Sequence, residues 1–114
     1  MTMVVHQKQQ KLIRDGMVDI ITRNGGIPRT RTLSNEAFRH ELLKKLVEEA
    51  IEVRDANGLD ELLLELADLE EVRRALFEAF AIDHERFELI RKSRARARGT
   101  FTKKLFLMSV KTKP

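Results

Sequence analysis

The chain has 114 residues and a mass of 13.3 kDa, which suits one domain and is too short for two that each bury a core. It contains no cysteine, which excludes disulfides, thiolate metal ligands and cysteine nucleophiles. Charged residues make up 35% of the chain and the net charge is +4, but acids dominate from Glu41 to Glu71 and bases from Arg91 to Lys104. This layout is expected where a cation and a polyanion meet in one site.

Glycine, asparagine and capping residues divide the chain into four predicted helices. A short helix is expected over 15–23, stopping at Asn24-Gly25-Gly26, with extended chain over 27–33. Ser34 predicts the cap of a second helix that lasts to about residue 56, and the turn Asn57-Gly58 leads into a third, antiparallel helix to about residue 80. Asp83 predicts the cap of a fourth helix to about residue 96, and residues 101–110 are expected to be extended. The predicted fold is therefore all-α, an antiparallel bundle of about four helices with short extended ends, in a single domain over 1–114.

Membrane insertion is not expected. No stretch reaches the roughly 18 apolar residues that a membrane helix needs, and Met1–Lys11 lacks the apolar core of a signal peptide. We expect a cytoplasmic protein. Because so small a chain buries little surface alone, we also expect self-association, as a homodimer or a homotetramer.

Two pairs of acids, each with a spacing of three residues, lie on the second and third predicted helices: Glu49 with Glu52, and Glu65 with Asp68. Residues three apart share a helix face. Glu49 lies on an apolar stripe of the second helix, and the second pair is set among apolar residues of the third, so these acids are expected to face the partner helix. The apolar neighbours are Leu42, Leu46 and Val53 on the second helix, and Leu62, Leu64, Leu69 and Val72 on the third.

Carboxylates that face one another repel and lose hydration, and a bound divalent cation offsets both effects. Oxygen ligands without histidine or cysteine favour Mg²⁺, or Mn²⁺, over Zn²⁺. Acids three residues apart also occur by chance on solvated helices, and a single pair would favour that interpretation. Two pairs on adjacent antiparallel helices favour the metal site.

The basic ends of the chain supply candidate phosphate ligands, because lysine and arginine contact phosphate oxygens. The alternative for each of these residues is a solvated basic surface. Gly99 is either a backbone contact for a ligand or an ordinary helix end. Nucleic-acid binding is not favoured, because the acidic helices would repel a phosphate backbone and no aromatic platform accompanies the arginines.

The motif Glu49-x-x-Glu52, twelve residues, then Glu65-x-x-Asp68 resembles the metal-binding signature of the all-α nucleoside triphosphate pyrophosphatase superfamily, the MazG-like proteins. Further segments look like its phosphoribosyl-ATP pyrophosphohydrolase-like, or predicted house-cleaning, subfamily. These segments are Lys11-Leu12-Ile13-Arg14-Asp15, Asn24-Gly25-Gly26-Ile27-Pro28, Lys92, and Arg98-Gly99-Thr100-Phe101. The resemblance covers roughly Lys11 to Leu107, which is nearly the whole chain.

The resemblance implies a Mg²⁺-dependent enzyme that hydrolyses a nucleoside triphosphate to a monophosphate and pyrophosphate, and a house-cleaning role towards non-standard nucleotides. It implies that Glu49, Glu52, Glu65 and Asp68 hold the metal and that Glu48 is a further ligand or orients the attacking water. The implied substrate-binding residues are Lys11, Arg14, Asp15, Lys92, Arg98 and Gly99.

Two alternatives remain open: hydrolysis of phosphoribosyl-ATP, and a helical protein that binds nucleotide or metal without turnover. The chain departs from the subfamily pattern at five positions, which leave the metal motif intact and bear on the pocket or on the oligomer contact. These positions are Gly16, Val18, Glu70, Arg73 and Thr100.

Overall fold

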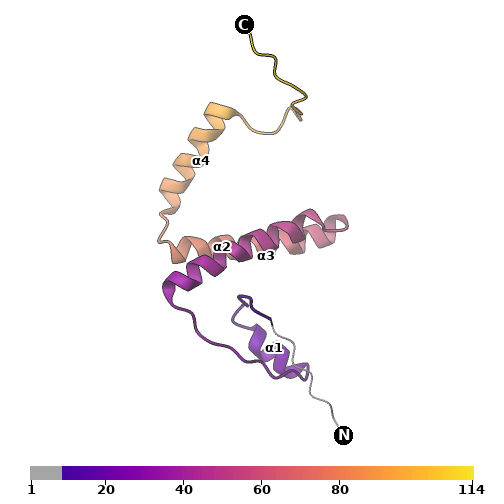
Figure 1. Cartoon of the computed structure of the whole chain (residues 1–114), viewed down its shortest axis with the longest axis vertical. Helices are drawn as coiled ribbons and strands as arrows, with labels where there is room; N and C mark the ends of the chain where they lie inside the picture. Colours follow the sequence, from indigo (N-terminus) through magenta and orange to yellow (C-terminus); the bar gives the residue numbers. More distant parts are fainter. Residues whose placement is uncertain (1–8) are drawn as a thin grey trace. The chain divides into compact units, whose positions relative to one another are not determined.

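The computed structural model of the protein describes residues 9–114, so most of the Met1–Lys11 segment, on which the signal-peptide prediction rests, lies outside the described residues. Four helices occur in this part of the chain and no strand does, which confirms the all-α prediction (Figure 1). The helices are α1 (Met17–Arg23), α2 (Asn35–Arg54), α3 (Gly58–Ala79) and α4 (His84–Arg98). Each predicted helix is present, with ends that differ from the prediction by about two residues.

The short helix α1 ends at the predicted glycines. Gly25 has a φ of 89°, which a residue with a Cβ adopts only at a cost, and its N–H donates to the Thr22 carbonyl at 3.1 Å. The N–H of Gly26 donates to the Ile21 carbonyl at 2.9 Å. These bonds satisfy carbonyls that the last helical turn leaves without partners.

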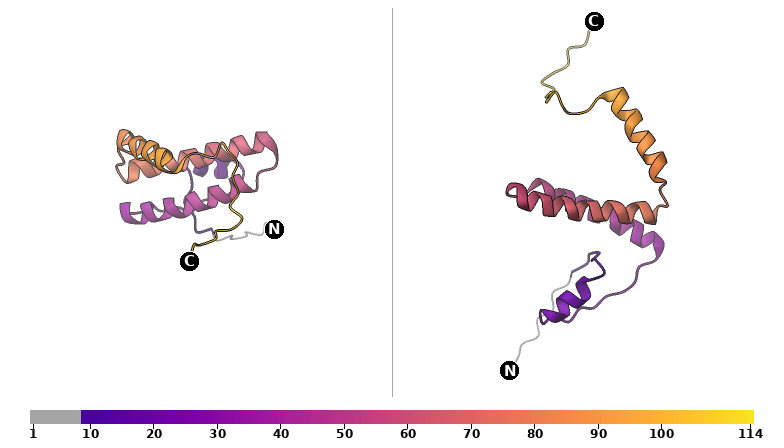
Figure 2. Two further views of the ribbon diagram at one scale, coloured as in Figure 1. Left: turned by 90° about the horizontal axis from the view of Figure 1, so that it is seen from above. Right: turned by 180° about the vertical axis from the view of Figure 1, so that it is seen from behind.

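Helices α2 and α3 form an antiparallel hairpin, and both views of Figure 2 show them side by side. Ser34 caps α2 as predicted, because its Oγ accepts from the N–H of Ala37 at 3.2 Å. The turn between the helices consists of residues 55–57, which is short enough to keep the two helices in contact.

The hairpin carries the buried core of the described chain. Leu42 is 2% exposed and clusters with Val72 and Leu76, while Leu12 packs against this cluster from the N-terminal segment. Phe77 is also buried. Leu64 was expected among the inward-facing residues, but it is 68% exposed, because it lies on a different side of α3 from Val72 and Leu76.

The chain divides into two compact units, one ending at Ala81 and the other covering Ile82–Pro114. In the second unit, Asp83 caps α4 as predicted by accepting from the N–H of Glu85 at 2.9 Å. Residues after Gly99 form a turn and then irregular chain, in which Phe101 and the apolar residues from Leu105 to Val110 are exposed. The single domain over 1–114 stays a prediction.

Within the described residues, no helix combines the length and the apolar character needed to cross a bilayer.

A carboxylate cluster on the helical hairpin

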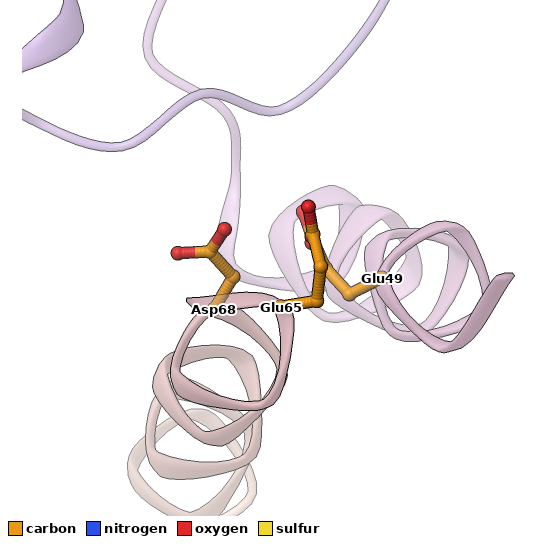
Figure 3. Close-up of side chains that lie close together, drawn as sticks. All are labelled: Glu49, Glu65 and Asp68. Atoms are coloured by element: carbon orange, nitrogen blue, oxygen red, sulfur yellow. The ribbon is translucent and has the colours of Figure 1, made fainter. Parts of the chain in front are cut away.

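The structure brings together three of the four predicted metal ligands. One carboxylate oxygen each from Glu49, Glu65 and Asp68 lies within 4.8 Å of the other two. Figure 3 shows Glu49 coming from α2 and the other two from α3, with all three side chains on the same side of the hairpin. All three are partly buried, which distinguishes them from most acids of this chain.

The position of the cluster follows from local sequence. Glu49 comes two turns after the buried Leu42 on α2, and Glu65 comes two turns before Val72 on α3. Two turns of helix return a side chain to nearly the same direction, so both acids point towards the contact between the helices. Asp68 follows Glu65 by three residues and borders that contact.

The fourth predicted ligand, Glu52, is exposed and lies outside the group of three. Its charge nevertheless acts on Glu65, so it borders the cluster. Glu48 is also outside the group, with its carboxylate 3.5 Å from the ammonium nitrogen of Lys45.

Two cations already accompany the cluster. Arg14 donates from Nη1 to Oδ1 of Asp68 at 3.1 Å, and Lys45 Nζ lies 3.7 Å from Oε1 of Glu49. The second pair is well shielded, with side chains only 17% and 14% exposed, whereas the first is 63% and 46% exposed. The repulsion among these acids was the reason to expect a bound cation. Two of them are in fact paired, so part of the repulsion is already offset.

Glu65 is the cluster acid that makes no ion pair within residues 9–114. Partial burial raises the pKa of its carboxyl group, and the nearby charges of Glu52, Asp68, Glu49 and Glu61 raise it further. Proton binding or cation binding would relieve this unfavourable charge. Among the three clustered acids, Glu65 is therefore the one whose charge is least compensated.

The N-terminal segment contributes one of its three predicted substrate-binding residues to the cluster. Leu12 packs on the core, and the carbonyl of Arg14 accepts from the N–H of Met17 at 3.0 Å, so the backbone around Arg14 is held at both ends. Its guanidinium group then reaches Asp68. Lys11 and Asp15 are exposed and make no ion pair or hydrogen bond with the cluster.

The other predicted substrate ligands, Lys92, Arg98 and Gly99, belong to the second unit. Lys92 lies near Glu88, whose pKa is lowered mainly by a hydrogen bond from Arg91 and also by the charge of Lys92. Gly99 ends α4 with a φ of 82°, and its N–H donates to the Ala95 carbonyl at 2.7 Å. Its role as the end of a helix is shown, and a role in substrate binding stays a prediction for all three residues.

Lys45 is the neighbour of the site that the sequence analysis overlooked. The signal was present, because a lysine four residues before a glutamate on one helix brings the two charges together. The contact of Arg14 with Asp68, 54 residues apart, has no such local signal.

No family model matches the chain, and neither the curated proteins nor the solved structures give a match. The resemblance to the MazG-like proteins therefore stays a prediction that rests on the motifs.

Proposed function

We propose that this protein is a Mg²⁺-dependent nucleotide pyrophosphohydrolase that cleaves a nucleoside triphosphate to a monophosphate and pyrophosphate. Its role would be house-cleaning, the removal of non-standard nucleotides. The observation that carries the proposal is the convergence of Glu49, Glu65 and Asp68 from two helices to within 4.8 Å. Arg14 beside this group supplies a cation that suits phosphate oxygens.

The donor set fits Mg²⁺. All three candidate ligands are carboxylate oxygens, and the described cluster includes no histidine. One oxygen of each acid lies within 4.8 Å of the other two, so the three carboxylates together could hold one small divalent cation. Glu52, at the border of the cluster, is available as a further or water-mediated ligand. Mn²⁺ fits the same donors.

A bound cation would neutralise charge on the phosphate oxygens as the bond between the α and β phosphates breaks. The remaining steps fall to residues of this chain. Water attacks the α phosphorus and pyrophosphate leaves, so no covalent intermediate with the protein is needed. We assign the orientation of that water to Glu48, as the resemblance implies, and its carboxylate, which lies outside the group of three, is the proton acceptor of this proposal.

Arg14 and Lys45 would act by position and charge. Arg14 is exposed enough to exchange its bond to Asp68 for a bond to a phosphate oxygen. Lys45 is largely shielded, and its ammonium group holds Glu49 in place in the face of the repulsion from Glu65. Lys45 is thus a positioning residue and Arg14 a substrate ligand.

The test is a panel of natural and modified nucleoside triphosphates and phosphoribosyl-ATP, incubated with Mg²⁺ or Mn²⁺, in which pyrophosphate and orthophosphate are measured separately. Glu65→Gln is expected to lower turnover by about 10²–10³-fold, because it removes a charge that acts at the reacting phosphate. Glu78→Gln is the matched control, since Glu78 lies on the same helix outside the cluster and its replacement should leave the rate unchanged.

Binding of Mg²⁺ is measured in parallel by titration calorimetry. Metal-dependent pyrophosphate release that Glu65→Gln removes would support the proposal. Binding of Mg²⁺ without turnover of any member of the panel would favour a non-catalytic binding protein, and release of orthophosphate alone would contradict the proposed bond cleavage.

A further inference from the structure

We propose that Arg14 competes with the divalent cation for Asp68, and that binding of the cation releases Arg14 from the carboxylate cluster. The inference rests on the proposed function, because it concerns the cation that the cluster would hold. Nη1 of Arg14 donates to Oδ1 of Asp68 at 3.1 Å, and Asp68 contributes an oxygen to the group of three acids. Arg14 and the divalent cation therefore require the same carboxylate.

The two cations at the cluster differ in their freedom to leave it. Lys45 precedes Glu49 by four residues on α2, so the helix keeps these two side chains adjacent whatever binds nearby. Arg14 lies before α1 and 54 residues from Asp68, and no helix fixes its distance from that carboxylate. Rotation of the arginine side chain is sufficient to break the contact. Arg14 is therefore the exchangeable cation of the site.

Charge decides between Arg14 and the divalent cation. A carboxylate has two oxygens, so Asp68 has acceptor positions for both partners. Two cations on one carboxylate lie within about 4–6 Å of each other, however, and like charges at this distance weaken each other's binding. Departure of the divalent cation would break contacts with all three acids, whereas departure of Arg14 breaks one hydrogen bond. Arg14 is therefore the group that leaves.

Release of Arg14 also links the metal to the nucleotide. A guanidinium group suits phosphate oxygens, to which it can donate two parallel hydrogen bonds. A nucleotide that arrives with its metal brings both the cation that displaces Arg14 and the oxygens that accept it. Metal and nucleotide should therefore strengthen each other's binding, whereas the metal alone meets competition from Arg14.

The first test measures Mg²⁺ binding to the full-length protein without nucleotide, by titration calorimetry at low ionic strength. Arg14→Gln removes the competing cation. Lys44→Gln is the matched control, because it also removes one positive charge, and the partner of Lys44, Glu41 at 3.4 Å, lies outside the group of three. An exposed ion pair changes an equilibrium by up to about 5-fold. Arg14→Gln should therefore raise the association constant for Mg²⁺ by about 3–5-fold, and Lys44→Gln by less than about 1.5-fold.

Amide hydrogen exchange, followed by NMR, gives a second readout on the wild-type protein itself. The N–H of Met17 donates to the carbonyl of Arg14 at 3.0 Å, so its exchange reports on the backbone that carries Arg14. Because coupling between two binding events is reciprocal, a cation that Arg14 opposes must in turn weaken the contact of Arg14 with Asp68. Saturating Mg²⁺ should therefore speed exchange at Met17 in wild type and leave it unchanged in Arg14→Gln.

Tighter Mg²⁺ binding by Arg14→Gln, together with faster exchange in wild type, would support the proposal. It is overturned by equal affinities of Arg14→Gln and wild type, by an equal gain in Lys44→Gln, or by exchange at Met17 that Mg²⁺ leaves unchanged. Weaker binding by Arg14→Gln would also overturn it and would make Arg14 a group that positions Asp68 for the metal. These outcomes leave the proposed hydrolysis to its own assay, whereas absence of Mg²⁺ binding in both proteins would refute the metal site on which both proposals rest.

Discussion

Replacement of Leu42 by alanine tests whether the hairpin core holds the carboxylates in place. Leu42 is 2% exposed and clusters with Val72 and Leu76 of the opposite helix. It lies on α2 two helical turns before Glu49. The substitution removes three carbon atoms, and at about 0.8 kcal/mol for each buried carbon the transfer loss is about 2.4 kcal/mol. Incomplete collapse of the cavity raises the expected loss to about 3 kcal/mol.

That loss is a large part of the roughly 5–15 kcal/mol that stabilises a typical domain, and it lowers the folding equilibrium constant by about 10²-fold. Urea denaturation followed by circular dichroism, with EDTA and at one protein concentration, measures it. Leu64→Ala is the control, because it deletes the same atoms from an exposed side chain and should cost no more than about 0.5 kcal/mol. A cost for Leu42→Ala within 1 kcal/mol of the control value would refute the assigned core.

Three further predictions concern the cluster and the end of α4. The pKa of Glu65 is raised in the folded state, so the metal-free protein should lose stability as the pH rises from the ordinary glutamate value of 4.5 to the raised value. Thermal melts with EDTA measure this loss, and Glu65→Gln should remove it. A steeper loss in the variant would contradict the assignment. Arg14→Ala should raise the KM for the triphosphate about 10-fold with a smaller change in kcat, and an unchanged KM would exclude Arg14 as a phosphate ligand. Gly99 has a φ of 82° and a ψ of −174°, a backbone region almost restricted to glycine. Gly99→Ala should therefore lower the local stability of the end of α4 by about 1–3 kcal/mol, measured as faster amide hydrogen exchange there. Unchanged exchange would count against backbone strain at this position.

The sequence predicted the helices well because their signals are local. Ser34 and Asp83 cap helices through bonds that span two or three residues, and Asn57-Gly58 ends one helix and starts the next within a few residues. The convergence of Glu49, Glu65 and Asp68 was also predictable, because spacing on each helix and a short antiparallel turn are sufficient to bring them together.

Features that depend on long-range packing were not predictable in this way. The contact of Arg14 with Asp68 depends on how the N-terminal segment settles on the core through Leu12. Glu52 follows Glu49 by the same three residues that separate Asp68 from Glu65, yet Glu52 is exposed and outside the group, so helical spacing alone does not distinguish the two acids. The type of an apolar residue likewise does not predict its burial, since Leu42 is buried and its neighbour Leu43 is exposed.

The hairpin also constrains how the length of this chain can vary. One added residue between Asp68 and Val72 would turn everything after it on α3 by about 100° relative to the acids, so that either the carboxylates or the core would lose their partners. A residue added in the turn at 55–57, which is largely exposed, would leave the spacing of side chains within each helix unchanged. In related sequences, insertions and deletions should accordingly be found at that turn and be rare within α2 and α3.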